Sequence, residues 1–597
     1  MLHNHKNLNL KPLIVALALS PGLVTAENQL SQIVVTANQI EQPLQNVTAD
    51  VTIITAEDLR AQRATSLIEV LNTVPGISFT QSGPLGTATS LYMRGSDNQR
   101  TLILIDGVRV QDPSSTSGAN LSDLIVSNIE RIEIIKGAQS GVWGADAAAG
   151  VINIITKQSL DTTFNVEHGA FNTGRTALST GFKLSKATVF LNGSYLSSEG
   201  FTAQAPVGER NLNQFENNGY QNTNLSARAM IPINENQSLT LSHNFTQARS
   251  EYDGWNNPND VKRADTRTDL SQLIYQIGST KLSAEQSLFT TEQLDDNTPD
   301  IVKGETQSIS LSHQHDNLLI GANYSQNKAS SDKFSWATGD NVLLKDTTHS
   351  KSVFATHSNQ WRSFTFNQAL RYDDYSNFGS EITGKLGAKM AITENQSVAV
   401  NYGTAYNAPS LVQILNPWGT GNPDLNPEKS VEASVTYQLH GLSATYFDKS
   451  VDDLINWQGG QFQNVKGKTT IKGVEAEYKQ RFDSWQFAVN YTHLDTEKAN
   501  GEPLARRPDN QVGLSLNWFV TDQLDINLNG QYIAKRSGNA DPVTENYSVW
   551  NGVINYDINN TASAYLKLNN IFNTYYQTVA GYATAQHSAY AGLTVQF

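Results

Sequence analysis

The most extended pattern in this sequence is an alternation of apolar and polar residues that runs from about residue 158 to the C-terminus. It is clearest at residues 239–246, 485–492, 514–518 and 524–532, and the chain ends in the same pattern at 590–597. A period of two residues is typical of β-strands that present one apolar face. A soluble β-sandwich has the same period, so the pattern predicts strands without defining their surroundings.

Residues 48–157 have a different pattern, which predicts a compact α+β domain. Apolar segments at 51–55, 101–105, 129–136 and 151–157 predict four strands. Residues 56–71 predict one amphipathic helix, because Leu59, Leu67, Ile68 and Leu71 share a side, and Val74-Pro75-Gly76 ends it. The loop 137–150 consists mostly of small residues, which allow a backbone to pack tightly against a wall.

The N-terminus predicts export from the cytoplasm. Two histidines and two lysines precede an apolar stretch at residues 13–24, which ends in Val24-Thr25-Ala26. This order is typical of a secretory signal peptide, cleaved here after Ala26. The alternative, a retained membrane anchor, is disfavoured because the apolar run is too short to span a bilayer. Residues 27–47, which we call the arm, are polar except for Ile33-Val34-Val35.

Composition narrows the class of protein. Only 16% of the 597 residues are charged, against roughly 25% in soluble domains. No apolar run beyond the N-terminus is long enough for a membrane helix, and polar uncharged residues and 22 tyrosines replace the missing charge, as a transmembrane β-barrel requires. The absence of cysteine excludes disulfide scaffolds and cysteine-rich zinc sites. The net charge of −14 disfavours a nucleic-acid partner.

Chain length favours one barrel size. The roughly 440 residues from 158 to 597 give about 20 residues per strand for 22 strands, close to ~10-residue spans with long outer loops. Sixteen strands would have about 27 residues each, which remains possible. A folded domain of about 110 residues, however, fits only the lumen of a barrel of about 22 strands. We therefore predict a 22-stranded antiparallel outer-membrane β-barrel (158–597) with an N-terminal α+β plug domain (48–157) in its lumen.

Several short motifs carry a family resemblance. They are residues 32–38 in the arm; 74–76, 94–95, 104–109 and 151–156 in the plug; and 406–409, 421–430, 471–475 and 569–573 in the barrel, followed by the terminal Phe597. With these motifs the chain resembles the TonB-dependent outer-membrane receptors, and among them those that transport cobalamin (vitamin B12). The resemblance implies active uptake of a large scarce nutrient by a monomer. Ferric siderophore and haem receptors share most of the motifs, so these cargoes stay open; a passive porin or structural adhesin is a more distant alternative.

The arm contains the segment that the resemblance identifies as the TonB box: Gln32, Ile33, Val34, Val35, Thr36, Ala37 and Asn38. A β-branched stretch in a polar, mobile arm is suited to adding a strand to the sheet edge of a partner. The alternative is an ordinary first strand of the plug. The resemblance implies that the partner is TonB, which with its inner-membrane complex delivers the energy of the proton gradient.

Two plug loops, residues 81–90 and 112–120, are expected to face outward and meet the substrate. Their small polar residues offer backbone and hydroxyl hydrogen bonds to a large ligand, although plain turn chemistry also explains them. By position, the resemblance implies substrate contacts at Ala88, Ser90, Asp97, Ser115, Thr116, Gly254 and Arg506. Four of these side chains, at positions 88, 97, 115 and 116, differ from the usual family residues.

Two acidic outer loops suggest calcium. The resemblance places ligands of a structural calcium ion at Gln214, Glu216, Asn218, Tyr252, Asp253 and Asp265. Oxygen donors of this kind suit a hard cation. Thr202 and Asn218, however, stand where carboxylates are expected, so calcium binding should be weaker or lost. The alternative is a pair of solvated acidic loops without metal.

No catalytic motif accompanies these features. The sequence contains no His-Glu-x-x-His, no Gly-x-Ser-x-Gly elbow and no Gly-x-Gly-x-x-Gly between a strand and a helix. Residues 141–150 are rich in glycine and alanine but lack the Lys-Ser/Thr of a phosphate-binding loop. We therefore expect a protein that is not an enzyme and uses no redox cofactor.

Overall fold

The structure of the protein, a computed structural model, describes residues 33–34, 37–254, 256–295, 298–335, 340–417, 420–534, 536 and 546–597. The predicted signal peptide and the TonB-box residues Gln32, Val35 and Thr36 lie outside the described residues. Within the ranges described, none of the helices has the length and apolarity needed to cross a membrane.

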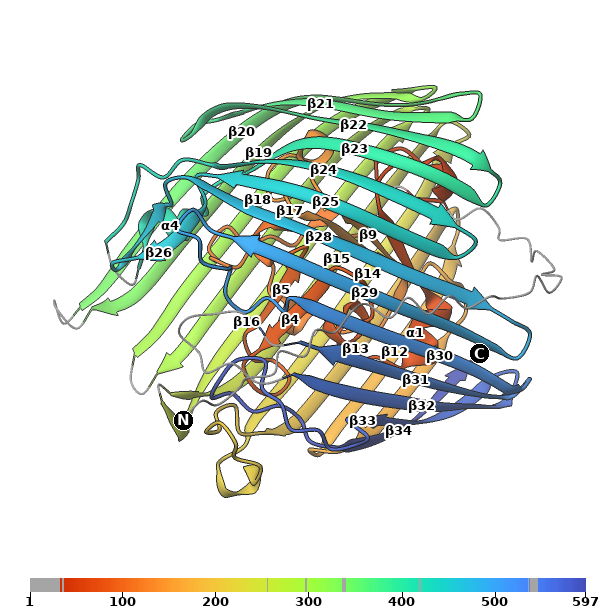
Figure 1. The fold of residues 1–597 in the computed structure, drawn as a ribbon, viewed down its shortest axis with the longest axis vertical. Coiled ribbons are helices and arrows are strands. Elements are labelled where there is room, and N and C mark those ends of the chain that lie inside the picture. Colours follow the sequence, from red (N-terminus) through yellow and green to blue (C-terminus); the bar gives the residue numbers. More distant parts are fainter. Residues whose placement is uncertain are drawn as a thin grey trace, which may run out of the picture.

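Twenty-two strands form one closed barrel, which confirms the predicted architecture (Figure 1). Neighbouring strands are antiparallel, and the first pairs with the last to close the ring, with Thr163 opposite Gln596. The strands are β11 (Thr163–Gly169), β12 (Thr173–Leu184), β13 (Ala187–Phe201), β14 (Asn218–Asn234), β15 (Gln237–Gly254), β16 (Asn257–Ile277), β17 (Thr280–Asp295), β18 (Thr298–His315), β19 (Leu318–Ser335), β20 (Asp340–Trp361), β21 (Phe364–Tyr375), β22 (Gly379–Thr393), β23 (Gln396–Asn407), β24 (Glu428–Leu439), β25 (Leu442–Asp452), β28 (Lys468–Arg481), β29 (Trp485–Glu497), β30 (Asn510–Thr521), β31 (Leu524–Ile533), β32 (Tyr547–Asn559), β33 (Ala562–Asn569) and β34 (Ser588–Gln596).

The alternation of residues along these strands separates lipid from lumen. Leu241 on β15 pairs with Leu273 on β16, and both side chains are about 40% exposed on the outside of the wall. The next pair, Ser242 and Gln272, faces inward, and Gln272 is buried. An apolar exterior around a polar interior is the arrangement of a transmembrane barrel and excludes the soluble sandwich.

Strand length differs from the sequence expectation of ~10-residue spans with long outer loops. The barrel strands range from 7 residues in β11 to 22 in β20. Strands β14 to β20 are the longest group because their hairpins keep pairing well beyond the length needed to cross lipid. Residues expected in outer loops therefore belong to the wall.

The plug lies inside the barrel as the red to orange segment of Figure 1. Its main sheet has the order β3-β9-β10-β7-β8, and a smaller sheet has the order β4-β5-β6. Leucine and isoleucine side chains without solvent exposure, such as Leu71, Leu91, Ile103 and Ile132, form its core. The elements are β3 (Val51–Thr55), α1 (Ala56–Gln62), α2 (Leu67–Leu71), β4 (Ile77–Gln81), β5 (Thr89–Met93), β6 (Ser96–Asp97), η2 (Asn98–Arg100), β7 (Thr101–Ile105), β8 (Val108–Arg109), η3 (Leu121–Asp123), β9 (Ile129–Lys136), α3 (Ser140–Trp143) and β10 (Gly150–Thr156).

The single helix predicted for residues 56–71 is wrong, because the structure has two helices there. Helix α1 begins at a capping box between Thr55 and Asp58 and ends at Arg63, whose φ of 46° is left-handed. The break turns Arg63 toward the wall, where its Nε donates to Asn555 Oδ1 at 2.7 Å and its guanidinium lies 4.4 Å from the Tyr565 ring centre. Contacts with the barrel thus override the helical pattern.

Smaller elements lie before the plug and between strands of the barrel. In the arm, β1 (Ile33–Val34) pairs with β2 (Gln42–Pro43), which η1 (Leu44–Asn46) follows. In the segments that connect barrel strands, η4 (Leu212–Gln214) precedes β14, and α4 (Leu411–Leu415) packs with a hairpin of β26 (Ile455–Gln458) and β27 (Gln461–Asn464). Figure 1 shows α4 and β26 together at one end of the barrel.

Candidate transport site

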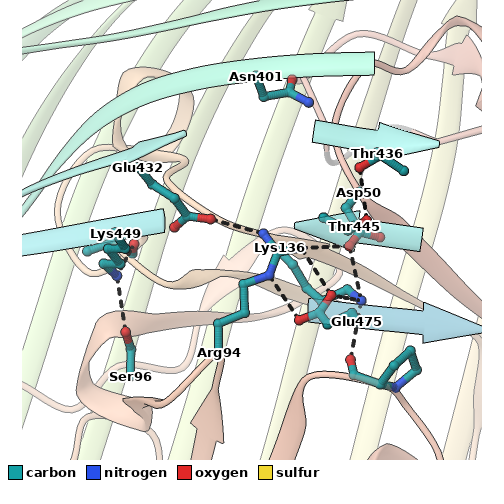
Figure 2. A network of polar contacts seen from close by, with 12 residues as sticks. Asp50, Arg94, Ser96, Lys136, Asn401, Glu432, Thr436, Thr445, Lys449 and Glu475 are labelled. Carbon is teal, nitrogen blue, oxygen red and sulfur yellow. Dashed lines mark hydrogen bonds and ion pairs between the residues drawn. The ribbon is translucent and has the colours of Figure 1, made fainter. Parts of the chain in front are cut away.

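A buried group of charges attaches the plug to the barrel (Figure 2). Arg94, which follows β5, donates to Glu432 on β24 at 2.9 Å, to Glu475 on β28 at 3.0 Å and to Asp50 at 2.7 Å. Lys136, at the end of β9, donates to Glu475 at 2.9 Å and lies 3.2 Å from Asp50. We call these five residues the ion-pair cluster.

Each buried ion of the ion-pair cluster has partners of opposite sign. Burial alone would raise the pKa of Asp50, but Lys136 and Arg94 outweigh it and lower that pKa to about 2. An isolated buried charge is costly, whereas a paired and hydrogen-bonded one is tolerated. Asp50 therefore stays ionised at neutral and mildly acidic pH, and the same two cations hold the plug to β24 and β28.

The cluster also explains three of the sequence motifs. Position 76 of the motif 74–76 requires glycine, because a Cβ on Gly76 would lie 1.9 Å from Glu475 Oε1. The arginine of 94–95 binds that carboxylate, and Glu475 itself ends the barrel motif 471–475. Three separated motifs thus meet at one point between plug and wall.

A second charged group contains Asp97, one of the predicted substrate residues. Asp97 pairs with Arg100, which also binds Glu428 on β24 through its Nε at 2.6 Å. Burial would raise the pKa of Asp97, but Arg100 and Arg507 lower it below its ordinary value. Asp97 is consequently a charged residue held in place by two arginines.

Of the Arg506-Arg507 pair, the structure directs the second toward the plug. Arg507 donates from Nε to the Gly95 carbonyl at 2.9 Å, and its guanidinium lies 4.2 Å from the Tyr92 ring centre. Arg506, the predicted residue, is exposed and has a left-handed φ of 68°. Two adjacent arginines give no sequence signal for which one faces inward, so Arg507 was missed.

The first plug loop is closed by its own backbone and bonded to an outer loop of the barrel. Its ends meet where Ser82 N donates to the Ala88 carbonyl at 3.0 Å, and Ala88 is exposed while Ser90 is half-buried. Gln81 exchanges two backbone hydrogen bonds with the Thr578 hydroxyl, at 2.9 and 2.8 Å. Thr578 lies in the last outer loop, between β33 and β34, which the sequence did not identify as part of the site.

The second plug loop places Ser115 and Thr116 at half-buried positions. Asp112 organises it by accepting from Ser114 N at 2.8 Å and from the Ser114 hydroxyl at 2.6 Å. Burial raises the pKa of Asp112 to about 6 despite these two hydrogen bonds.

A polar cavity of about 540 Å³ runs beside the plug, against strands β16 to β21. Its lining includes Ser115 and Gly118 in the second plug loop and Gln39 and Glu41 in the arm. Of the seven predicted substrate residues, Ser115 lines this cavity; Ala88, Ser90, Asp97, Thr116, Gly254 and Arg506 do not. The structure therefore distributes the predicted contacts over several outer positions and does not form one pocket from them.

The described part of the arm is packed inside the barrel, where the sequence suggested a mobile segment. Ala37 and Asn38 are buried, and the Thr356 hydroxyl on β20 donates to the Asn38 carbonyl at 2.8 Å. Val34 pairs with Gln42, so Ile33 and Val34, the strand residues of the predicted TonB box, belong to a small sheet of the arm itself. They do not extend the main plug sheet, the alternative considered above.

The predicted calcium ligands are only partly brought together. Asp253 Oδ2 accepts from Gln204 N at 2.7 Å and from the Thr202 hydroxyl at 3.2 Å, while Asn218 Oδ1 accepts from Ala203 N at 2.5 Å. Asp265 is instead held by Arg249 at 2.9 Å and Arg263 at 2.6 Å. Among the described residues, no three acidic or histidine side chains are grouped to hold a metal. Side-chain hydrogen bonds thus join the loops at Asp253 and Asn218, and Asp265 is bonded to arginines instead.

Comparisons with known proteins place this geometry in context. The sequence model of the TonB-dependent receptor-like β-barrel matches residues 154–571, and that of the TonB-dependent receptor plug domain matches residues 43–151. The vitamin B12 transporter BtuB of Vibrio vulnificus (strain CMCP6) is 29% identical over 604 residues, covering 95% of each chain. Two solved structures share the fold: the siderophore receptor PirA from Acinetobacter baumannii (17% identity, 92% of this chain and 98% of that one, TM-score 0.77) and a mutant of the ferric enterobactin receptor PfeA from Pseudomonas aeruginosa in complex with enterobactin (19%, 92% and 99%, 0.75).

Proposed function

Given that this chain belongs to the TonB-dependent receptors, transporters of the outer membrane that are not enzymes, we propose that its cargo is cobalamin (vitamin B12). The observation that carries the proposal is the similarity to a vitamin B12 transporter along 95% of both chains. The two siderophore receptors that share the fold are below 20% identity, so they support the architecture and not a cargo.

The proposed energy source is TonB, which would act on the arm. The main-chain pairing of Val34 with Gln42 shows that this segment already adopts a strand. A partner that adds its own strand edge can replace such a two-residue pairing, because main-chain hydrogen bonds of equal kind are exchanged. Pulling would then act along the arm toward Asp50 and the ion-pair cluster.

The proposed cargo is tested by titrating the purified protein with cyanocobalamin and, in parallel, with ferric enterobactin and haem. We expect saturable cyanocobalamin binding, and cobalamin-dependent growth when this chain complements a strain that lacks its own transporter. Binding of either iron ligand without cyanocobalamin binding at micromolar concentration would assign the cargo to iron uptake.

We further propose that binding does not depend strongly on calcium. Asp265, a predicted ligand, is neutralised by two arginines, and Asp253 is already bonded to the Thr202 hydroxyl and to Gln204 N. Calcium prefers six to eight oxygens with several carboxylates. The cyanocobalamin titration is therefore expected to give similar affinities with excess calcium and with EGTA. A tenfold loss of affinity in EGTA would contradict this proposal and support a calcium site.

A further inference from the structure

The first plug loop rests on one tyrosine of the wall. Tyr220, the third residue of β14, is 2% exposed and belongs to a small apolar cluster against which Leu85 of that loop packs. The next loop residue, Gly86, lies so close to the same ring that a Cβ there would be 2.0 Å from the Tyr220 Cδ2 atom. The ring of Tyr220 therefore determines where the backbone of the first plug loop can lie.

The hydroxyl of Tyr220 is bonded to the turn that follows the second plug loop. It donates to Asp123 Oδ1 in η3 at 3.0 Å, and the Ser122 carbonyl, at 3.3 Å, is a more distant acceptor. Asn222 Nδ2 donates to the same hydroxyl at 2.9 Å. Asp123 Oδ2 accepts in turn from the Nδ2 of Asn120, the last residue of the second plug loop, at 2.7 Å. Tyr220 and Asp123 thus form a continuous link between the two plug loops.

The half-buried carboxylate of Asp123 is also bonded to the wall. In addition to the Tyr220 hydroxyl and the Asn120 amide, the Thr266 hydroxyl on β16 donates to Asp123 Oδ2 at 2.6 Å. These three donors are uncharged, and hydrogen bonds to a charged acceptor are stronger than those between neutral groups. Because Thr266 holds the carboxylate, loss of the Tyr220 hydroxyl would leave Asp123 in place and break only the link to the first plug loop.

We propose that Tyr220 is a positioning residue for the cargo, because its ring and its hydroxyl together fix the two plug loops at one distance from each other. The inference deepens the proposed function and rests on it, since it applies to a ligand large enough to contact both loops. Loops that are held in the binding arrangement before the ligand arrives lose less conformational freedom on binding, which raises affinity. Without the Tyr220 hydroxyl the loops move independently, and affinity falls while the transport step stays unchanged.

Tyr220→Phe tests the proposal, because it keeps the ring beside Leu85 and Gly86 and removes only the hydroxyl. We expect the Kd of cyanocobalamin for whole cells to rise about fivefold or more, and the maximal rate of energised uptake to stay within about twofold. The matched control is Tyr565→Phe, which removes a hydroxyl that donates to a buried carboxylate between wall strands, Glu167 on β11, at 2.9 Å. The control should leave the Kd and the rate within about twofold. An unchanged Kd for Tyr220→Phe, an equal rise in the control, or a fall in maximal rate of the same size would overturn the proposal.

The other half of the link gives an independent variant. Asn120→Ser removes the amide that donates to Asp123 but keeps a side-chain oxygen of the kind that caps η3. We expect the same rise in Kd, and no further rise when Asn120→Ser is combined with Tyr220→Phe, because both substitutions break one link. Additive effects of the two substitutions would show that the residues act separately and would contradict the proposal.

A distance measurement does not depend on the cargo. The natural chain has no cysteine, so Ala88→Cys and Ser117→Cys, both at exposed positions, place one spin label in each plug loop. In the purified protein without ligand, pulsed electron paramagnetic resonance should give a narrow distribution of distances. Tyr220→Phe should at least double its width, while Tyr565→Phe should leave it unchanged. Equal widths would overturn the proposal even if cyanocobalamin binds. A doubled width in a protein that binds no cyanocobalamin would support the link between the loops and reject only the cargo.

Discussion

Glu475 is the residue that connects the two domains most directly, because it binds both Arg94 and Lys136 while fully buried. Glu475→Gln leaves two buried cations with too little negative charge, a change that costs about 3–5 kcal/mol when a buried ion pair is broken. In this variant we expect the plug to unfold at a lower guanidinium concentration than the barrel. Hydrogen exchange of β5 and β9 follows the unfolding of the plug. The matched control is Asp448→Asn, which breaks a half-exposed pair with Lys472 on the outer wall and should leave the plug unchanged.

Asp112 gives the second plug loop a pH dependence. Its pKa in the folded protein, about 6, lies above the ordinary value of 3.8 in the unfolded chain. The ionised carboxylate therefore opposes folding at neutral pH, and stability rises as pH falls from about 7 to 4. We expect amides 112–118 to exchange more slowly at pH 5 than at pH 7 after correction for intrinsic rates. Asp112→Asn should remove this difference, whereas Asp316→Asn, at an exposed turn, should not.

Single residues of the site were the hardest to predict. The sequence identified Asp97 as important, but its contacts with Arg100 and Arg507 depend on the way η2 and the β29–β30 loop meet in space. Thr578 is almost 500 residues from Gln81, and no local pattern indicates that the two bond. Glu432 and Glu475 stand in alternating strands like many others, and only the plug reveals their role.

Among the elements, helix α3 shows how closely the plug fits the wall. A Cβ on Gly141 would lie 3.0–3.2 Å from the backbone of Gly384 and Lys385 on β22, which cannot move aside easily. Gly141→Ala should therefore destabilise the docked plug by about 1–3 kcal/mol. The check is guanidinium unfolding of the plug, with Gly174→Ala on β12 as the control because a Cβ there meets nothing within 4 Å. An unchanged midpoint for Gly141→Ala would show that α3 is loosely docked.

The dependence of uptake on TonB can be tested by substitutions in strand β1. Proline at Val34 removes the amide hydrogen that a strand partner needs. We expect Val34→Pro to abolish energised uptake while cyanocobalamin binding to whole cells stays normal, and Val34→Ala, which keeps the amide, to retain both. Uptake by Val34→Pro at the natural rate would favour a passive channel.

Elements with a local sequence pattern were predicted correctly. The prediction failed where contacts with the other domain determine the structure. Strands β3, β7 and β9 lie where apolar runs predicted them. The helix of residues 56–71 breaks because Arg63 is drawn to Asn555 and Tyr565 on the wall. The small-residue loop 137–150 does pack against the wall as expected, although α3 inside it carried no helical signal.

At the scale of the whole molecule, composition and chain length were sufficient for the architecture. Low charge, period-two alternation and an extra domain of about 110 residues together require a wide barrel with a filled lumen. Because the ring closes through β11 and β34 without any plug residue, the barrel should survive removal of residues 27–157. We expect that variant to conduct ions steadily in planar bilayers and the full chain to stay silent. A silent truncated barrel would mean that the outer loops close the pore on their own.

The seam between β11 and β34 also determines the order in which the molecule can be made. The ring is complete only when β34 has been synthesised and pairs with β11, next to which Phe597 N donates to the Thr162 carbonyl at 2.8 Å. Until the barrel strands are present, Arg94 and Lys136 lack the carboxylates of Glu432 and Glu475, which lie more than 300 residues downstream. Before the wall is present, the two cations have only the plug's own Asp50 as a partner, so the plug cannot complete its bonding first and be wrapped later. Synthesis runs from plug to barrel, whereas the bonding of the plug is completed late, when the wall that carries Glu432 and Glu475 is present.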